Sequence, residues 1–284
     1  MARALILRAM LAGAIGGLVA FVFARIFAEP LIQQAIDYES GRDEAQAALD
    51  AAAGQAAEAE GPELFSRAVQ GNVGIGAGIV LFGVALGCLF GVAFCLAYGR
   101  YGAVTARKLA VRLGVAGFLA IYLVPFVKYP ANPPAIGNGD TIAQRGSLYL
   151  GMVVASVVFG LLAVRLGRAL QPRVGTTAAT WYAAIAFVVV IGIVMALLPP
   201  LGSLAANAGA TGPELSETPQ PLLDPAGKIV YPGFDADLLY WFRLYSVTAQ
   251  VLLWGVLVAV FGPLAERVLG SSSAAQRDEL AATG

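Results

Sequence analysis

Six long apolar runs divide this chain, and they limit its fold more than any other feature. Each run is long enough, or nearly so, to cross about 30 Å of hydrocarbon. The runs comprise residues 5–28, 69–98, 109–127, 147–166, 178–198 and 240–262. A helix satisfies all the backbone amides and carbonyls of such a run in lipid. The charged fraction of 13% also lies far below the value of about 25% in soluble domains. The sequence therefore predicts an all-α integral membrane bundle of six transmembrane helices, in which residues 1–284 form a single domain.

The basic residues indicate how this bundle is oriented. Taken together, the amino terminus, residues 99–112, residues 165–177 and the tail at residues 264–284 hold most of the arginines and lysines and few of the acids. Because basic loops stay in the cytoplasm, we expect both termini to be cytoplasmic, in a multi-pass protein of the plasma (inner) membrane.

Two long connectors are then expected on the outer side. Residues 29–66 form an acidic outer connector, in which Ile32, Ala35 and Ile36 share one helical face. This pattern predicts a short helix at the outer interface, directly after the first span. Residues 199–239 are rich in proline, glycine and acids, which predicts a mobile outer connector.

Glycines in the first two runs are spaced for close helix contact. They are Gly13 and Gly17 in the first run, and Gly74, Gly78, Gly83, Gly87 and Gly91 in the second. Small residues four apart let helices approach closely in lipid, within one chain or in a homo-oligomer formed through the glycine faces. A pore lined by glycine backbone is the alternative.

Cys88 and Cys95 are about 10 Å apart along a helix, too far for a disulfide, and are either small core residues or soft ligands.

Several classes of function are disfavoured. The chain has no histidine, the commonest general base and transition-metal ligand. It has no phosphate-binding loop motif, and its apolar runs contain no acid away from their ends. Its net charge is zero, which gives no reason to expect nucleic acid as a partner. We therefore expect no enzymatic activity, with the lipid bilayer as the surroundings of the chain.

Oxygen-bearing side chains flank the runs on the predicted outer side. We expect a vestibule for a divalent cation built from Glu29, Glu39, Asn132, Asp235 and Asp237, since oxygen ligands hold such ions weakly enough for passage. The alternatives are an ion pair between Arg25 and Glu29, and capping of the last run by Asp235 and Asp237.

Two further features would shape this vestibule. Arg243 lies one turn inside the last run and is expected to pair with Asp237 or Glu29 and to orient the carboxylates. Pro130, Pro133 and Pro134 fall within five residues, so they are expected to form a stiff, extended loop that presents carbonyls.

The same stretches carry a resemblance to a known family. They are Ala12-Gly13, Glu29-Pro30-Leu31-Ile32 with Ala35, Tyr38 and Glu39, the segment from Lys128 to Ala135 with its Asn-Pro-Pro, and the segment from Phe234 to Leu239 with Phe242-Arg243-Leu244 and Gln250. In these residues the chain resembles the CbtA family of probable cobalt transporter subunits. The resemblance implies a polytopic inner-membrane component of cobalt supply for cobalamin synthesis. It also implies a small single-span, histidine-bearing membrane partner, CbtB.

The sequence thus predicts the membrane subunit of a divalent metal uptake system, with cobalt as the ion that the resemblance implies. No permanently bound cofactor is expected, and the divalent cation would be cargo. Two alternatives remain open: a non-transporting scaffold that assembles other membrane proteins, and a membrane enzyme at the outer leaflet.

Overall fold

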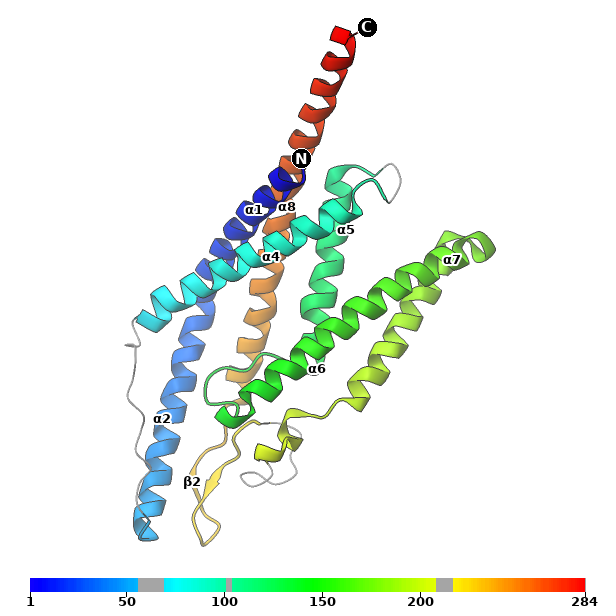
Figure 1. Cartoon of the computed structure of the whole chain (residues 1–284). Helices are drawn as coiled ribbons and strands as arrows, with labels where there is room; N and C mark the ends of the chain where they lie inside the picture. The colour runs from blue at the N-terminus through cyan, green and yellow to red at the C-terminus, as the bar shows by residue number, and fades with distance from the viewer. Residues whose placement is uncertain (56–68, 101–103, 208–216, 284) are drawn as a thin grey trace. The chain divides into compact units, whose positions relative to one another are not determined.

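The computed structural model describes residues 1–55, 69–100, 104–207 and 217–283 (Figure 1). Within these ranges, five helical segments are long and apolar enough to cross a membrane. The chain is therefore an all-α membrane protein, as predicted. In the same ranges, one small antiparallel hairpin pairs β1 (Leu222–Leu223) with β2 (Ile229–Tyr231).

The amino-terminal helix is longer than predicted. α1 (Ala2–Phe23) continues through a π-helical segment, Ala24–Ala28, into α2 (Glu29–Ala52). Pro30 cannot donate the usual backbone bond four residues back, and the wider π turn directly before it absorbs this loss. The prediction of a short outer helix was therefore wrong in length, because α2 has 24 residues. Its location at the interface stays a prediction.

The third apolar run follows the same pattern. α5 (Ala106–Gly117) passes through a π-helical segment, Phe118–Leu123, into α6 (Val124–Lys128). Pro125 lies at the start of α6. The π turns before Pro125 accommodate its missing backbone donor within a continuous helical segment.

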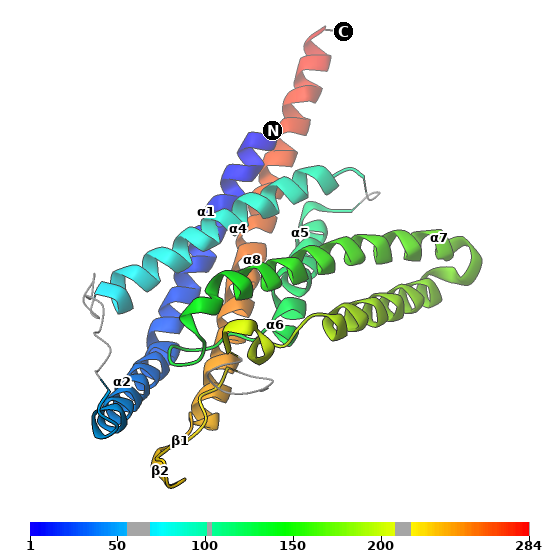
Figure 2. The same ribbon diagram turned by 60° about the horizontal axis from the view of Figure 1, so that its bottom comes forward.

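The fourth and fifth apolar runs share one helical element, α7 (Ile142–Leu197). Gly175 interrupts the element with φ 78° and ψ 166°, a conformation that glycine adopts readily. Figures 1 and 2 show the two arms of α7 folded back side by side. The 3-10 turns Leu201–Ser203 and Ala205–Asn207 follow. Part of the connector predicted as mobile is thus regular, and its mobility is not tested.

By its internal contacts the chain divides into two compact units. The first comprises Met1–Pro30, Gly61–Phe118 and Leu244–Gly284, and the second comprises Leu31–Glu60 and Leu119–Arg243. α8 (Ala236–Thr283) begins in the second unit and ends in the first, and it extends through the tail predicted at residues 264–284.

In the first unit, glycines hold α1 against α4 (Ile75–Ala97), which follows the π-helical segment Gln70–Gly74. A Cβ atom added at Gly17 would lie 2.9 Å from the carbonyl oxygen of Ile79, and one at Gly83 would overlap the carbonyl oxygen of Gly13. Gly13, Gly17, Gly83, Gly87 and Gly91 are therefore used in packing within the chain, as the packing interpretation expected. A Cβ atom added at Gly78 would meet no other atom within 4 Å, and a homo-oligomer through glycine faces stays a prediction.

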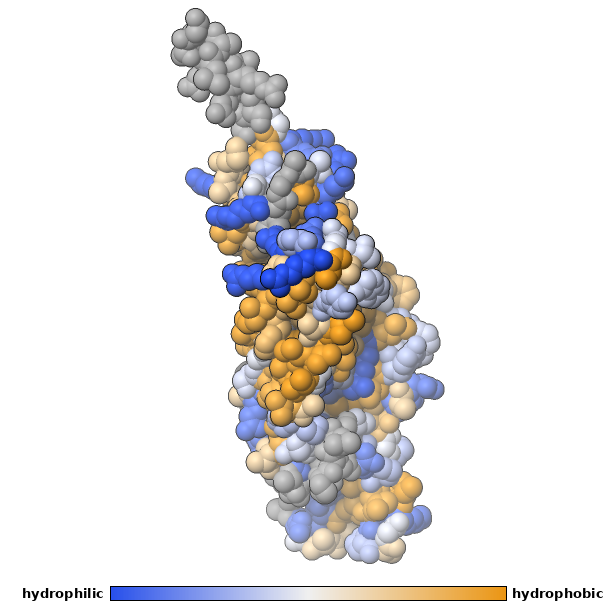
Figure 3. Space-filling view, turned by 90° about the vertical axis from the view of Figure 1, so that its right-hand side faces the viewer, coloured by the Kyte–Doolittle hydropathy of each residue, from blue (hydrophilic) through white to orange (hydrophobic). Residues whose placement is uncertain are grey.

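The outward faces of the helices are apolar. Leu81, Leu89 and Leu96 on α4 are 59–66% exposed. Figure 3 shows apolar side chains covering much of the helical surface on the face that it draws. Such a surface is compatible with lipid rather than with water.

Candidate functional site

In the second unit, three segments that are distant in sequence meet at an apolar cluster. α2 contributes Ala35, the loop after α6 contributes Ile136, and the start of α8 contributes Leu238 with Phe234 just before it; all four are buried. The Tyr38 hydroxyl donates to the carbonyl of Pro232 at 3.0 Å. The cluster fixes how α2, the proline-rich loop and α8 approach one another.

The proline-rich loop has a tightly defined path. Pro133 is fully buried, and the amide of Ile136 donates to the carbonyl of Pro133 at 3.3 Å. Pro134 is exposed. Ala135 has φ 70° and Gly137 has φ 125°, and the left-handed conformation at Ala135 is costly for a residue with a Cβ atom. The loop is therefore turned as well as stiff, which the three prolines alone did not predict.

Arg243 binds this loop, and its expected alternative partner Glu29 belongs to the first unit, so the pairing with Glu29 stays a prediction. Its Nη2 donates to Oδ1 of Asn132 at 2.8 Å, and its Nε donates to the carbonyl of Ala131 at 3.3 Å. The expected pairing with Asp237 is wrong, because the guanidinium reaches the loop. Oδ1 of Asn132, the side-chain atom that would bind a cation, is therefore engaged by a positive charge.

The acids of the second unit lie around the same segments. Glu39 of α2 accepts a hydrogen bond from the amide of Ala135. Although much of Glu39 is exposed, burial of its carboxyl raises its pKa above the ordinary value. The negative charge of Asp43, one turn further along, raises this pKa again.

Asp235 and Asp237 stand at the start of α8. Oδ1 of Asp235 accepts from the amide of Asp237 at 2.7 Å and from the amide of Leu238 at 3.4 Å. Asp235 is therefore a helix cap, as the alternative interpretation held. Both acids are exposed, and Asp237 lies in the first turn, where its charge complements the helix dipole.

Arg25 and Glu29 belong to the first unit. Arg25 lies in the π-helical segment, and Glu29 is the first residue of α2. The other four predicted vestibule residues belong to the second unit, so the proximity of Glu29 to them stays a prediction. Among the described residues, no group of three or more Asp, Glu or Cys side chains is arranged to hold a metal ion.

Sequence reasoning missed a buried polar network around Glu217. Its side chain is 2% exposed and forms an ion pair with Arg145 at 3.3 Å. The Thr141 hydroxyl and the Asn207 amide each donate to Oε1 of Glu217 at 2.8 Å. Such a satisfied network ties the start of α7 to the connector that follows it. Its only sequence signal is an isolated acid in a connector, which is too common to be informative.

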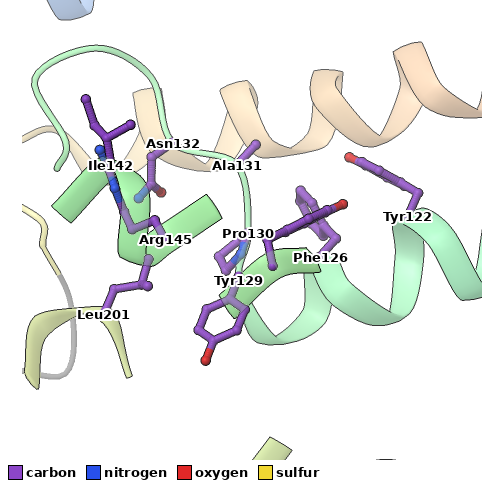
Figure 4. A pocket seen from close by; sticks show the side chains of 10 residues that line it. Tyr122, Phe126, Tyr129, Pro130, Ala131, Asn132, Ile142, Arg145 and Leu201 are labelled. Carbon is purple, nitrogen blue, oxygen red and sulfur yellow. The ribbon is translucent and has the colours of Figure 1, made fainter. Parts of the chain in front are cut away.

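Next to this network lies a cavity of about 440 Å³. Most of its walls are aromatic or apolar: Tyr122, Phe126, Tyr129, Pro130, Ala131, Ile142, Tyr149 and Leu201. Its remaining lining residues are Asn132 and Arg145. Figure 4 shows these two side chains near one end and Tyr122 near the other. Sequence reasoning singled out Asn132 as a cation ligand and did not predict this cavity.

Comparison with known proteins places the chain in a family. A search of curated proteins and a search of solved structures found no significant match. A family model described as "Probable cobalt transporter subunit (CbtA)" matches residues 2–266, from α1 through the apolar part of α8. Because this match covers most of the chain, the protein belongs to the CbtA family.

Proposed function

We propose that this protein is the membrane subunit of a system that takes up a divalent cation, with cobalt as the cargo. The observation that carries the proposal is the family match over residues 2–266. The apolar helices support it, since a transporter subunit must cross the bilayer. In this proposal the divalent cation is the transported substrate and not a permanently bound cofactor.

The proposed topology has six membrane crossings. Each arm of α7 counts as one crossing, because the arms correspond to the apolar runs at residues 147–166 and 178–198. The basic connectors favour cytoplasmic termini in the plasma membrane. α2, the proline-rich loop and the start of α8 would then lie on the outer side.

We propose that carboxylate side chains on this side bind the incoming cation. Glu39 and Asp43 are one helical turn apart on α2, and their mutual repulsion would be relieved by a bound cation. Asp235 and Asp237 supply further exposed oxygens. Carboxylates bind hard and borderline ions without holding them permanently. Asn132 is not in this set, because its oxygen accepts from Arg243.

A histidine-bearing partner fits this assignment. The chain has no histidine, and imidazole suits borderline transition metals better than carboxylate does. The word "subunit" in the family description supports a system of several components. We propose a small single-span CbtB-like protein as the component that concentrates the ion.

Radioactive cobalt uptake tests the proposal. Cells lacking the gene should lose uptake, and the wild-type gene should restore it. Glu39→Gln combined with Asp237→Asn should lower uptake at subsaturating cobalt by about tenfold, the effect of losing roughly 1.4 kcal/mol of ion binding. Glu44→Gln, at an exposed acid on α2, is the matched control and should leave uptake unchanged.

The possible failures are distinguishable. Uptake that does not depend on the gene would refute transport and favour a scaffold. Uptake that depends on the gene but not on Glu39 and Asp237 would refute only the assignment of the acids.

A further inference from the structure

We propose that the cavity beside the proline-rich loop binds an oxyanion, phosphate or carboxylate, carried on an apolar body. The cavity belongs entirely to the second unit. The inference does not depend on cobalt transport, because it comes from the donor and acceptor groups that line the cavity.

The cavity, at about 440 Å³, has the size of a site for an organic molecule. Small-molecule sites commonly have volumes of about 300–1,000 Å³ and mainly apolar walls. Phe126, Ile142 and Leu201 supply such walls here.

The nitrogen-bearing side chains of the lining offer hydrogen-bond donors, beside the hydroxyls of Tyr122, Tyr129 and Tyr149, which can donate or accept. Oδ1 of Asn132 accepts from Arg243, which fixes the orientation of the amide and leaves its Nδ2 as the group that can serve a ligand. The guanidinium of Arg145 adds further donors. No carboxylate is among the residues that line the cavity. A divalent cation would therefore meet a positive charge, whereas an oxyanion would meet matched donors.

The arrangement around Arg145 keeps its donors accessible. The carboxylate of Glu217 is 2% exposed, but the Arg145 side chain is 26% exposed. Gly137, with φ 125°, leaves the space that this guanidinium occupies, since a Cβ atom there would overlap it. The ion pair is thus open to the cavity mainly on its cationic side.

The charge near the loop also favours an anion. The guanidinium of Arg243 donates to a neutral side-chain amide and to a backbone carbonyl, and neither of these contacts neutralises its positive charge. Asn132 accepts a hydrogen bond from Arg243 and also lines the cavity. A phosphate or carboxylate bound to Asn132 and Arg145 would be held by two charge-assisted interactions, one direct and one through the amide.

Substitution of a single donor tests the inference. Asn132→Asp keeps an oxygen for Arg243 but replaces the amide donor with an anion of the same shape. Purified protein in detergent is titrated with phenyl phosphate, with short-chain phosphatidylglycerol and with cobalt chloride. We expect Asn132→Asp to weaken binding of the phosphate probes by about 10-fold to 100-fold, the effect of losing a hydrogen bond to a charged group.

The control carries the same change of charge outside the cavity. Gln144→Glu adds a negative charge at an exposed position next to Arg145. It should leave the affinities for phenyl phosphate and phosphatidylglycerol within about twofold of the wild type, since exposed charges are screened. Binding of phosphatidylglycerol alone would identify the ligand as a lipid headgroup, and binding of phenyl phosphate would identify a soluble compound. Both results support an oxyanion site.

Three results would overturn the inference. The first is that the wild type binds neither phosphate probe. The second is that Asn132→Asp leaves phosphate affinity unchanged. The third is that Asn132→Asp raises cobalt affinity without weakening phosphate binding, which would mark Asn132 as a position that serves a cation.

Discussion

Replacement of one glycine on the buried face of α4 should separate α1 from α4. A Cβ atom at Gly91 would lie 2.9 Å from Cβ of Ala9 and 2.9 Å from Cα of Ile6. Carbon atoms pack best at about 3.5–4.0 Å, so in Gly91→Ala the helices must move apart by roughly 0.6–1 Å. The Cα atom of Ile6 belongs to the backbone and cannot rotate away. Overpacking of this kind costs about 1–3 kcal/mol.

The expected result is a lower midpoint of thermal unfolding in detergent. At about 2–4 °C per kcal/mol for a chain of this size, Gly91→Ala should lower Tm by roughly 2–12 °C. The matched control is Gly78→Ala in the same helix, where an added Cβ would meet nothing within 4 Å. This change should leave Tm unchanged or raise it slightly, because alanine favours helix over glycine by up to about 1 kcal/mol.

A double variant sharpens this comparison. Ala9→Gly removes one of the two atoms that the new methyl group meets, so Gly91→Ala with Ala9→Gly should recover part of the lost stability. If Gly91→Ala and Gly78→Ala have the same Tm, the close contact between α1 and α4 does not stabilise the protein and the packing argument is wrong.

Two further predictions concern charges in the second unit. Glu217→Ala leaves Thr141, Asn207 and Arg145 without their shared carboxylate and should lower the free energy of unfolding by about 1–3 kcal/mol; no measurable loss in chemical denaturation would contradict a structural role for this network. In the folded protein the pKa of Glu39 is raised above its ordinary value of 4.5. The carboxyl therefore ionises more easily in the unfolded chain, and the folded protein loses stability as the pH rises above 4.5. Glu39→Gln should therefore raise Tm at pH 7, and this gain should disappear below about pH 4, where the carboxyl is protonated in both states. A Glu39→Gln gain in Tm that is equal at both pH values would refute the electrostatic cause.

Much of the helical framework could be predicted from the sequence. The apolar runs indicated where long apolar helices form, and the glycine spacing predicted close helix packing without naming the partner helix. Asp235 could be expected to cap α8 from its position alone. These features depend on neighbours within a few turns, where helical periodicity decides which groups meet.

The length of α2 could not be predicted. Pro30 suggested a boundary, but a preceding π turn keeps the helix continuous. An isolated sequence does not reveal whether a π turn will form, since the packing of the surrounding residues decides whether its cost is tolerated.

The sequence by itself determined the class of protein and the position of its helices, because the need to pair backbone groups in lipid and to bury apolar side chains is written in local composition. Only the tertiary structure decided the partners of the charged residues. Arg243 contacts Asn132, and Arg145 contacts Glu217, across 111 and 72 positions of the chain. Each charge had several possible partners of suitable chemistry. The path of the proline-rich loop, fixed by its buried contacts with α2 and α8, selected the partner of Arg243 and left Asn132 at the edge of a cavity with its donor free to serve a ligand.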